Sequence, residues 1–238
     1  MICPQLLSAT GRTLREAMVT SLFPMFMKLT GKQCLVVGAG RIGGPKIGGL
    51  IDTGARIHVV AIEASEQAHE WARAGKIDLE IRSFSPHDLD AKFFAIVATA
   101  SEQLNRLVYR EAEQRGVLCN VVDVPELCDF FYPAVVRRGD LQIAISTAGQ
   151  SPSLAQKLRQ QLERQFGPGY TEWVAQLGET RRLILASPLD KECKWELLHS
   201  LASREAFEAA LAKVAAVEQA ELSRRKLENN RGHAVGTV

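Results

Sequence analysis

Three glycines in the N-terminal half are spaced as in turns that bind phosphate groups. Gly38, Gly40 and Gly43 form a G-x-G-x-x-G pattern, and the apolar residues 33–37 lead into it. In a strand-to-helix turn the first glycine permits the tight turn, the second admits a pyrophosphate, and the third lets helix and strand pack closely. Free N–H groups at the helix start, around Arg41 and Ile42, would bind the phosphates. The pattern predicts a dinucleotide site, and the alternative is a glycine turn that binds nothing.

An acidic residue indicates which dinucleotide binds. Glu63 lies twenty residues beyond Gly43, just after Ile62 and a second apolar segment, 56–61. A carboxylate at this place accepts hydrogen bonds from the ribose diol and repels a 2′-phosphate, which favours NAD over NADP. The alternative is a solvated loop glutamate, because Glu63 comes slightly later than the predicted strand end.

A second acid follows the strand predicted at 118–122. Asp123 would lie at the carboxyl end of that strand, where ligands bind in open α/β sheets. A carboxylate there can move a proton or stabilise a developing positive charge. The equally weighted alternative is a turn residue before Pro125.

The other polar residues give weaker signals. Cations in the C-terminal half could form an anion pocket, although each one taken singly is better explained as part of a solvated helix face. These cations are Arg137, Arg138, Lys157, Arg159, Arg164, Arg181 and Arg182. The histidines have no ligand spacing, so we predict no metal site. The five scattered cysteines indicate reduced thiols in a cytoplasmic protein.

Composition bounds the class of protein. The 238 residues are 46% apolar and 24% charged, which is typical of an ordinary globular protein of one or two domains. The net charge of +2 is too small to argue for a nucleic-acid or membrane partner. No apolar run reaches the roughly 18 residues of a membrane-spanning helix.

The elements that must position these residues alternate between strand and helix up to about Asp123, as in a doubly wound parallel sheet. The predicted strands are 33–37, 56–61, 77–82, 93–99 and 118–122, and the helices are 42–53, 65–74 and 101–115. After Pro125 we expect strands at 130–137 and 140–146 with a turn at Arg138-Gly139. A helix at 153–166 follows, with Ser153 and Gln156 as a capping box. Helices then continue to about Leu227, before a frayed tail.

Together, these segments resemble the precorrin-2 dehydrogenases of sirohaem synthesis, including the N-terminal module of sirohaem synthase. The resemblance covers about residues 22–165, and it weakens in the helical tail. The segments that carry it are Leu22–Phe26, Gly38–Lys46, Val59–Glu63, Val97–Thr99, Asn120–Asp123, the strand of Pro133, and Ala144–Pro152.

The resemblance implies NAD-dependent oxidation of precorrin-2 to sirohydrochlorin, with insertion of Fe²⁺ as a further activity in some relatives. It implies that Asp123 is catalytic and that Ala98 and Thr99 help to bind NAD. The tetrapyrrole would be bound by Asn120, Ser146, Thr147, Gly149 and Ser151. Alternatives are a dehydrogenase that lacks chelatase activity and a non-catalytic NAD-sensing regulator.

The resemblance also implies a domain plan and a homodimer. Residues 1–21 would be an extension, 22–132 a Rossmann-type NAD-binding domain, 133–163 a small α+β dimerisation segment, and 164–238 a helical domain.

The sequence departs from the family pattern at three places. Pro45 stands where the family often has arginine, but proline in the first helical turn loses no intrahelical bond. Gly48 and Gly49 should each weaken that helix by roughly 1 kcal/mol. Thr147 replaces a serine that can be phosphorylated in the sirohaem synthase module.

Overall fold

A computed structural model describes residues 22–209 of the chain. The predicted extension 1–21 lies outside the described residues, as do the predicted helical residues 210–227 and the tail beyond them. The chain divides into two compact units after Tyr132, and each unit is described by itself. Within the described residues, no helix has the length and apolar character needed to cross a membrane.

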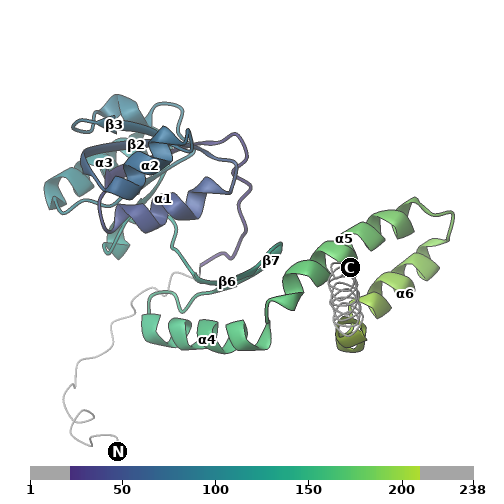
Figure 1. The fold of residues 1–238 in the computed structure, drawn as a ribbon. Helices are drawn as coiled ribbons and strands as arrows, with labels where there is room; N and C mark the ends of the chain where they lie inside the picture. Colours follow the sequence, from purple (N-terminus) through teal and green to yellow (C-terminus); the bar gives the residue numbers. More distant parts are fainter. Residues whose placement is uncertain (1–21, 210–238) are drawn as a thin grey trace, which may run out of the picture. The chain divides into compact units, whose positions relative to one another are not determined.

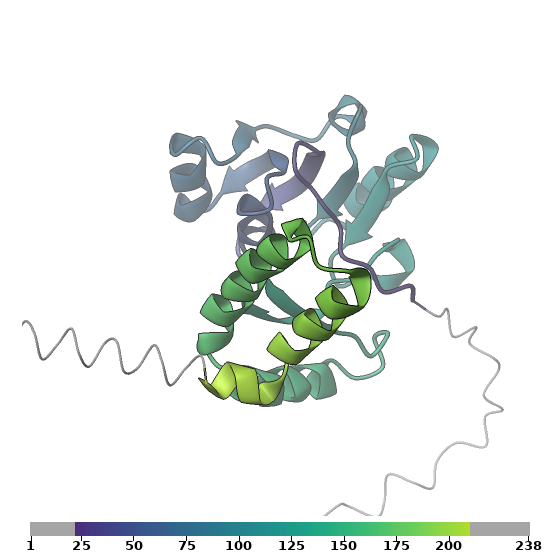
Figure 2. The ribbon, with the colours of Figure 1, turned by 90° about the vertical axis from the view of Figure 1, so that its right-hand side faces the viewer.

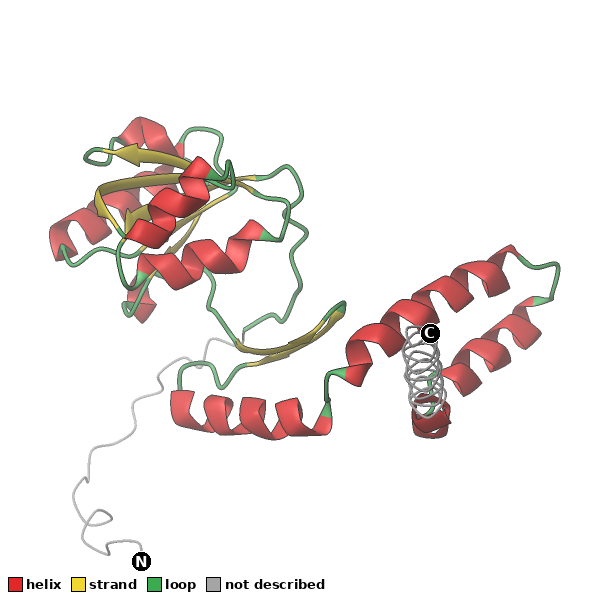
Figure 3. Ribbon diagram, viewed as in Figure 1, coloured by secondary structure: helices red, strands yellow, loops and turns green. Residues whose placement is uncertain are grey.

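The first unit is a five-stranded parallel sheet with helices on both faces (Figures 1 and 3), which confirms the predicted α/β fold. Its strands lie in the order β3-β2-β1-β4-β5, and all neighbouring pairs are parallel. The strands are β1 (Gln33–Ala39), β2 (Arg56–Ala64), β3 (Asp78–Ile81), β4 (Phe94–Val97) and β5 (Leu118–Val121). The helices are α1 (Gly43–Ile51), α2 (Glu66–Arg73) and α3 (Glu102–Gln114), with short 3₁₀ turns η2 (Pro86–Leu89) and η3 (Pro125–Leu127).

The central strands are apolar throughout because both of their faces are covered. Along β1, Cys34 and Val36 pack with α1 and α2, whereas Leu35 and Val37 pack with α3 on the opposite face. All four side chains are buried. This alternation gives the sheet two separate apolar layers and fixes the register of β1 between β2 and β4.

The second unit begins with an antiparallel hairpin of β6 (Ala134–Arg138) and β7 (Leu141–Ile145). Helix α4 (Pro152–Gln165) packs on this hairpin, and its one buried residue is Ala155. The Arg138 guanidinium donates to the carbonyl oxygens of Phe166 and Glu163 and so holds the end of α4 to the hairpin. Helices α5 (Gly169–Ala186) and α6 (Lys191–Leu201) pack against each other (Figure 2).

Two boundaries in the hairpin region differ from the prediction. The strand expected from Phe130 begins at Ala134, because the Phe130 carbonyl accepts a hydrogen bond from Asn120 and Pro133 has no N–H for a strand ladder. The turn is formed by Gly139 and Asp140, because Arg138 still pairs with Leu141.

The predicted cap of α4 was wrong. Ser151 is the N-cap residue, and its hydroxyl accepts from the Leu154 N–H at 3.2 Å. Pro152 then occupies the first helical position, where its missing N–H costs nothing. Ser153 and Gln156 therefore do not form the predicted capping box, and the cap lies two residues earlier, at Ser151. For α3 the predicted cap, Ser101, is confirmed.

Candidate functional site

The predicted cofactor residues lie at the carboxyl edge of the sheet, where the strand order reverses. Strands β1 and β4 are neighbours although they are not consecutive in the chain. The connections from these two strands therefore leave in opposite directions, and in open α/β sheets this is the place where ligands bind. Gly38 lies near the end of β1 and Ala98 directly follows β4, and the Ala98 N–H donates to the Val37 carbonyl at 2.8 Å.

The three glycines of the turn have three different surroundings. Gly38 has φ +102°, and a Cβ on it would lie 2.4 Å from the carbonyl oxygen of Ala98. A Cβ on Gly43 would lie 2.0 Å from the carbonyl oxygen of Gly38. A Cβ on Gly40 would have no atom within 4 Å, so Gly40 faces open space. Gly38 and Gly43 are thus required by packing, whereas the surface at Gly40 is free to receive a ligand.

The start of α1 suits an anion. Its N-cap residue, Ile42, supplies no side-chain cap, and the first turn of this helix contains no acidic residue. The first N–H groups of a helix have no intrahelical partner and carry a partial positive charge. Together with the open space at Gly40, this end of α1 fits the pyrophosphate of a dinucleotide.

Thr99 is fixed by a residue that the sequence reasoning missed. Its hydroxyl donates to Oδ1 of Asn105 at 2.7 Å, and Nδ2 of Asn105 donates back to the Thr99 carbonyl at 3.3 Å. Asn105 is a buried polar residue on α3. A polar residue in the apolar stripe of a predicted helix is the signal that could have drawn attention to it.

Strand β2 extends further than predicted. It includes Ile62 and Glu63 and ends at Ala64, so Glu63 belongs to the strand and not to the loop after it. The Ser65 N–H donates to the Ala39 carbonyl, which holds the end of β2 beside the end of β1. Both Ile62 and Glu63 are exposed at this edge.

Asp123 follows β5 in an unusual backbone conformation. Its φ is +64°, in the left-handed region, and its side chain is exposed. The Val122 N–H donates to the Val97 carbonyl at 2.9 Å, which holds the start of this turn against β4. A non-glycine residue with positive φ is uncommon and often marks a functional position.

A cation lies near Asp123. Burial lowers the pKa of Lys46 on α1, and the charge of the Asp123 carboxylate partly opposes this shift. The ammonium of Lys46 lies 4.0 Å from the centre of the Tyr132 ring, within the range of a cation–π contact. The charges of Asp123, after β5, and of Lys46, on the helix that follows the glycine turn, therefore interact.

The predicted substrate residues are divided between the two units. Asn120 is buried in the first unit, and its amide donates to the Phe130 carbonyl at 2.7 Å. This bond joins β5 to the segment after η3 and so closes the stretch of chain that contains Asp123. The amide is already engaged within the protein.

The loop after β7 carries the remaining predicted substrate residues. The hydroxyl of Ser146 accepts from the Ala148 N–H, and that of Thr147 accepts from the Ser151 N–H, both at 3.1 Å. Ala148 and Gly149 both have positive φ. These local bonds define the shape of the loop, and each hydroxyl retains its own proton for donation.

The predicted anion-binding cations fall into two groups. Arg138 is bonded to carbonyl groups, Arg159 pairs with Glu163, and Arg182 pairs with Glu179. No ion pair within the described residues involves the others, Arg137, Lys157, Arg164 and Arg181. The second group is therefore available to anions.

Comparisons with known proteins agree with this arrangement. Residues 25–134 match the family described as "Putative NAD(P)-binding". Residues 138–165 match the family described as "Sirohaem biosynthesis protein central". A solved structure of SirC, a precorrin-2 dehydrogenase, superposes with a TM-score of 0.72 at 30% sequence identity, covering 84% of this chain and 99% of SirC. The chain belongs to the family of precorrin-2 dehydrogenases and sirohaem synthase N-terminal modules.

Curated relatives of this family are longer than the chain. "Siroheme synthase 2" of Yersinia enterocolitica is 39% identical over 180 residues, which are 74% of this chain and 38% of the relative. "Siroheme synthase" of Nitrosococcus oceani is 41% identical over 147 residues, 62% of this chain and 31% of the relative. The match therefore covers less than two-fifths of the length of either relative.

Proposed function

We propose that the protein oxidises precorrin-2 to sirohydrochlorin, with NAD⁺ as the hydride acceptor. The observation that carries this proposal is the similarity to SirC along nearly the whole of that protein. In the reaction a hydride passes from the macrocycle to the nicotinamide, and a proton leaves the substrate, so the products are sirohydrochlorin, NADH and H⁺. The protein must hold the two reactants side by side and accept the proton.

Residues at the carboxyl edge of the first unit would hold the cofactor. The open surface at Gly40 and the uncapped start of α1, at Arg41 and Ile42, would bind the pyrophosphate. Ala98 and Thr99 would line the crevice beside the nicotinamide half. Ile62 and Glu63 would contact the adenosine half, where the carboxylate of Glu63 accepts from the ribose diol and disfavours a 2′-phosphate. The family is NAD(P)-binding, and Glu63 is our reason to propose NAD.

Asp123 would act as the general base. Its exposed carboxylate projects from the turn after β5, and the buried amide of Asn120 supports this turn. Lys46, whose pKa is influenced by the charge of Asp123, is a cation that could pair with a carboxylate of the bound substrate. Asn120 thus enters our proposal as a positioning residue, not as the substrate ligand first expected.

The loop of the second unit would bind the tetrapyrrole. Ser146, Thr147, Gly149 and Ser151 offer hydroxyl and backbone groups to the carboxylates of precorrin-2. The arginines and lysine of the second unit that make no internal ion pair are the candidates for pairing with the other carboxylates. A substrate with eight carboxylates would need several cations of this kind, although the net charge of the chain is only +2.

The test is NADH formation from precorrin-2 and NAD⁺. Asp123→Asn should reduce kcat by about 100-fold or more, the typical contribution of a general base, with NAD⁺ binding unchanged. Asp52→Asn, an exposed aspartate at the end of α1, is the matched control and should retain full activity. An unchanged rate in Asp123→Asn removes Asp123 from the mechanism. No NADH from the wild-type protein would favour the alternative of a non-catalytic NAD-sensing regulator.

Iron insertion is a second candidate activity. It requires a base for the pyrrole protons that Fe²⁺ displaces, and the exposed carboxylate of Asp123 suits this step as well. Sirohydrochlorin with Fe²⁺ or Co²⁺, without NAD⁺, tests it separately. Failure of metal insertion together with normal NADH formation would identify a dehydrogenase that leaves chelation to another protein.

We also propose a homodimer, formed through residues 133–163. On α4 the side chains of Leu154 and Leu158 are 48% and 36% exposed, which gives the second unit an uncovered apolar surface. Sedimentation analysis of the wild-type protein and of Leu154→Glu should distinguish dimer from monomer.

The unpaired cysteines of the described chain are consistent with our expectation of a cytoplasmic protein.

A further inference from the structure

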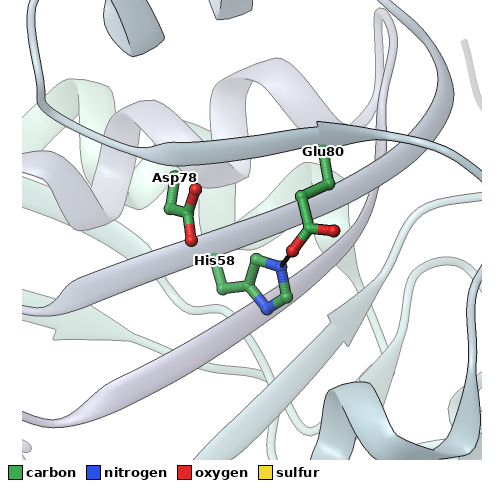
Figure 4. A group of neighbouring side chains, drawn as sticks. All are labelled: His58, Asp78 and Glu80. Carbon is green, nitrogen blue, oxygen red and sulfur yellow. Dashed lines mark hydrogen bonds and ion pairs between the residues drawn. The ribbon is translucent and has the colours of Figure 1, made fainter.

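Three potential metal ligands meet on two neighbouring strands of the first unit. In the parallel register of β2 and β3, His58 pairs with Asp78, the first residue of β3. Glu80 comes two residues later and therefore lies on the same face of this edge strand as Asp78. The three side chains converge, and their ligand atoms all lie within 4.8 Å of one another (Figure 4).

The ligand atoms of this group are oriented by neighbouring residues. Oε1 of Glu80 lies 2.7 Å from Nε2 of His58, and Oε2 of Glu80 accepts from Nε of Arg82 at 2.6 Å. Arg82 is held in turn by two hydrogen bonds, of 2.8 and 2.6 Å, to the buried carboxylate of Asp88. Such outer contacts fix ligand orientation in metal sites, and here they point one oxygen of Glu80 at His58.

One carboxylate of this group, that of Asp78, is not engaged by a neighbouring side chain within the described residues. Arg82 is shared between Glu80 and Asp88. Within residues 22–209, no hydrogen bond or ion pair involves the Asp78 carboxylate, which nevertheless lies close to Glu80. Two carboxylates at this separation repel each other, and a dication between them removes the repulsion.

We propose that His58, Asp78 and Glu80 bind a divalent transition-metal ion, with zinc as the best match. One imidazole nitrogen and two carboxylate oxygens suit Zn²⁺ and Co²⁺ better than Mg²⁺ or Ca²⁺, which prefer oxygen ligands alone. Because β3 is an edge strand and the Glu80 side chain is 43% exposed, water can occupy a further coordination position of the ion. A bound ion would link β2 to the edge strand of the sheet.

This site is separate from the proposed catalytic groups. Asp123 and the glycine turn lie at the carboxyl ends of β5 and β1, whereas Asp78 begins β3. The sequence reasoning predicted no metal site because its ligands come from two strands. The parallel register of β2 and β3 brings His58 close to Asp78 and Glu80. A short sequence motif could not predict this contact, because His58 lies twenty or more positions before Asp78 and Glu80.

The experiment is a Co²⁺ titration of the full chain, followed by visible absorption, in the absence of NAD⁺ and tetrapyrrole. Wild-type protein should bind with bands typical of nitrogen and oxygen ligands. His58→Ala and Asp78→Asn should each weaken this binding at least ten-fold and leave NADH formation unchanged. His87→Ala is the matched control, because His87 contacts the single carboxylate of Asp90, at 3.1 Å, and should bind as wild type.

A second measurement guards against a folding defect in the variants. Zn²⁺ should raise the unfolding temperature of the wild-type protein and of His87→Ala, but not that of Asp78→Asn. Asp78 is exposed, so its amide variant should fold normally. The proposal is overturned if wild-type protein binds no Co²⁺, or if His58→Ala and Asp78→Asn bind it as tightly as wild type. Neither result would bear on the dehydrogenase assay.

Discussion

Gly48 of α1 lies against the indole ring of Trp71 on α2, so that a Cβ on Gly48 would be 3.4 Å from Cη2 of the ring. Gly49, the next residue, would place its Cβ in open space with no atom within 4 Å. The two glycines that depart from the family pattern thus have different roles. The first allows α2 to approach α1, and the second makes no contact that requires glycine.

Gly49→Ala should therefore raise the free energy of unfolding by about 0.5–1 kcal/mol, because alanine is the better helix former. Gly48→Ala should raise the free energy of unfolding by less, because its methyl group would lie 3.4 Å from the Trp71 ring, at the limit of van der Waals contact. Urea unfolding of both variants measures the difference. Equal gains would mean that the Trp71 ring moves away without cost.

Gly40→Ala and Gly43→Ala place the same methyl group in different surroundings. Gly40→Ala should fold as wild type but bind NAD⁺ at least ten-fold more weakly, because the methyl group enters the surface proposed for the pyrophosphate. Gly43→Ala should lose about 1–3 kcal/mol of stability, the usual range for overpacking, since its Cβ meets the Gly38 carbonyl. Thermal unfolding and NAD⁺ titration of both proteins separate the two effects. Tight NAD⁺ binding by Gly40→Ala would argue against this phosphate position.

Replacement of Glu63 should change the preference between cofactors. Glu63→Ala removes the charge that repels a 2′-phosphate and the acceptor of the ribose diol. The ratio of kcat/KM for NAD⁺ to that for NADP⁺ should fall at least ten-fold. Glu70→Ala, which removes an exposed carboxylate from α2, should leave the ratio unchanged. If both variants behave alike, Glu63 does not select the cofactor.

The Arg82–Asp88 pair predicts a pH dependence of stability. Burial alone would raise the pKa of Asp88, but the hydrogen bonds from Arg82 and the Ser85 N–H bring the net pKa below its ordinary value. A pKa lowered by folding stabilises the protein above the unfolded value of about 3.9. This stabilisation is lost as the pH falls through the lower, folded value.

Asp88→Asn should therefore cost about 2 kcal/mol near neutral pH, the scale of a hydrogen bond to a charged group. The difference from wild type should shrink as the pH falls below about 4. Urea unfolding across this pH range provides the measurement. Asp90→Asn, an exposed neighbour, is the control and should show a much smaller cost at neutral pH. A constant difference down to the lowest pH would contradict the lowered pKa.

The first unit could be predicted well because its local signals agree with one another. Apolar runs bounded by glycine define the strands, and the serine at 101 caps its helix as expected. The alternation of strands and helices predicts a doubly wound parallel sheet, and the structure has one, with the strand order β3-β2-β1-β4-β5. Errors are confined to the ends of elements, such as the extension of β2 through Glu63.

Contacts between distant residues could not be predicted. Ser151 and Ser153 are both plausible caps, and Pro152 decides between them only once the helix start is known. The bond between Asn105 and Thr99, and the pairing of Asn120 with the Phe130 carbonyl, depend on how separate segments pack. The family resemblance predicts Asn120 as a substrate ligand, but the hydrogen bonds that these two asparagines make within the protein cannot be predicted from the sequence.

The left-handed turn at Asp123 has a consequence for any attempt to make the protein more stable. A side chain with φ +64° costs up to about 1 kcal/mol relative to glycine at the same place, although aspartate tolerates this region better than most residues. Selection for heat resistance alone would therefore favour glycine at this position, and a glycine variant would lack the carboxylate. Position 123 is where the requirements of folding and of chemistry are expected to diverge in this chain.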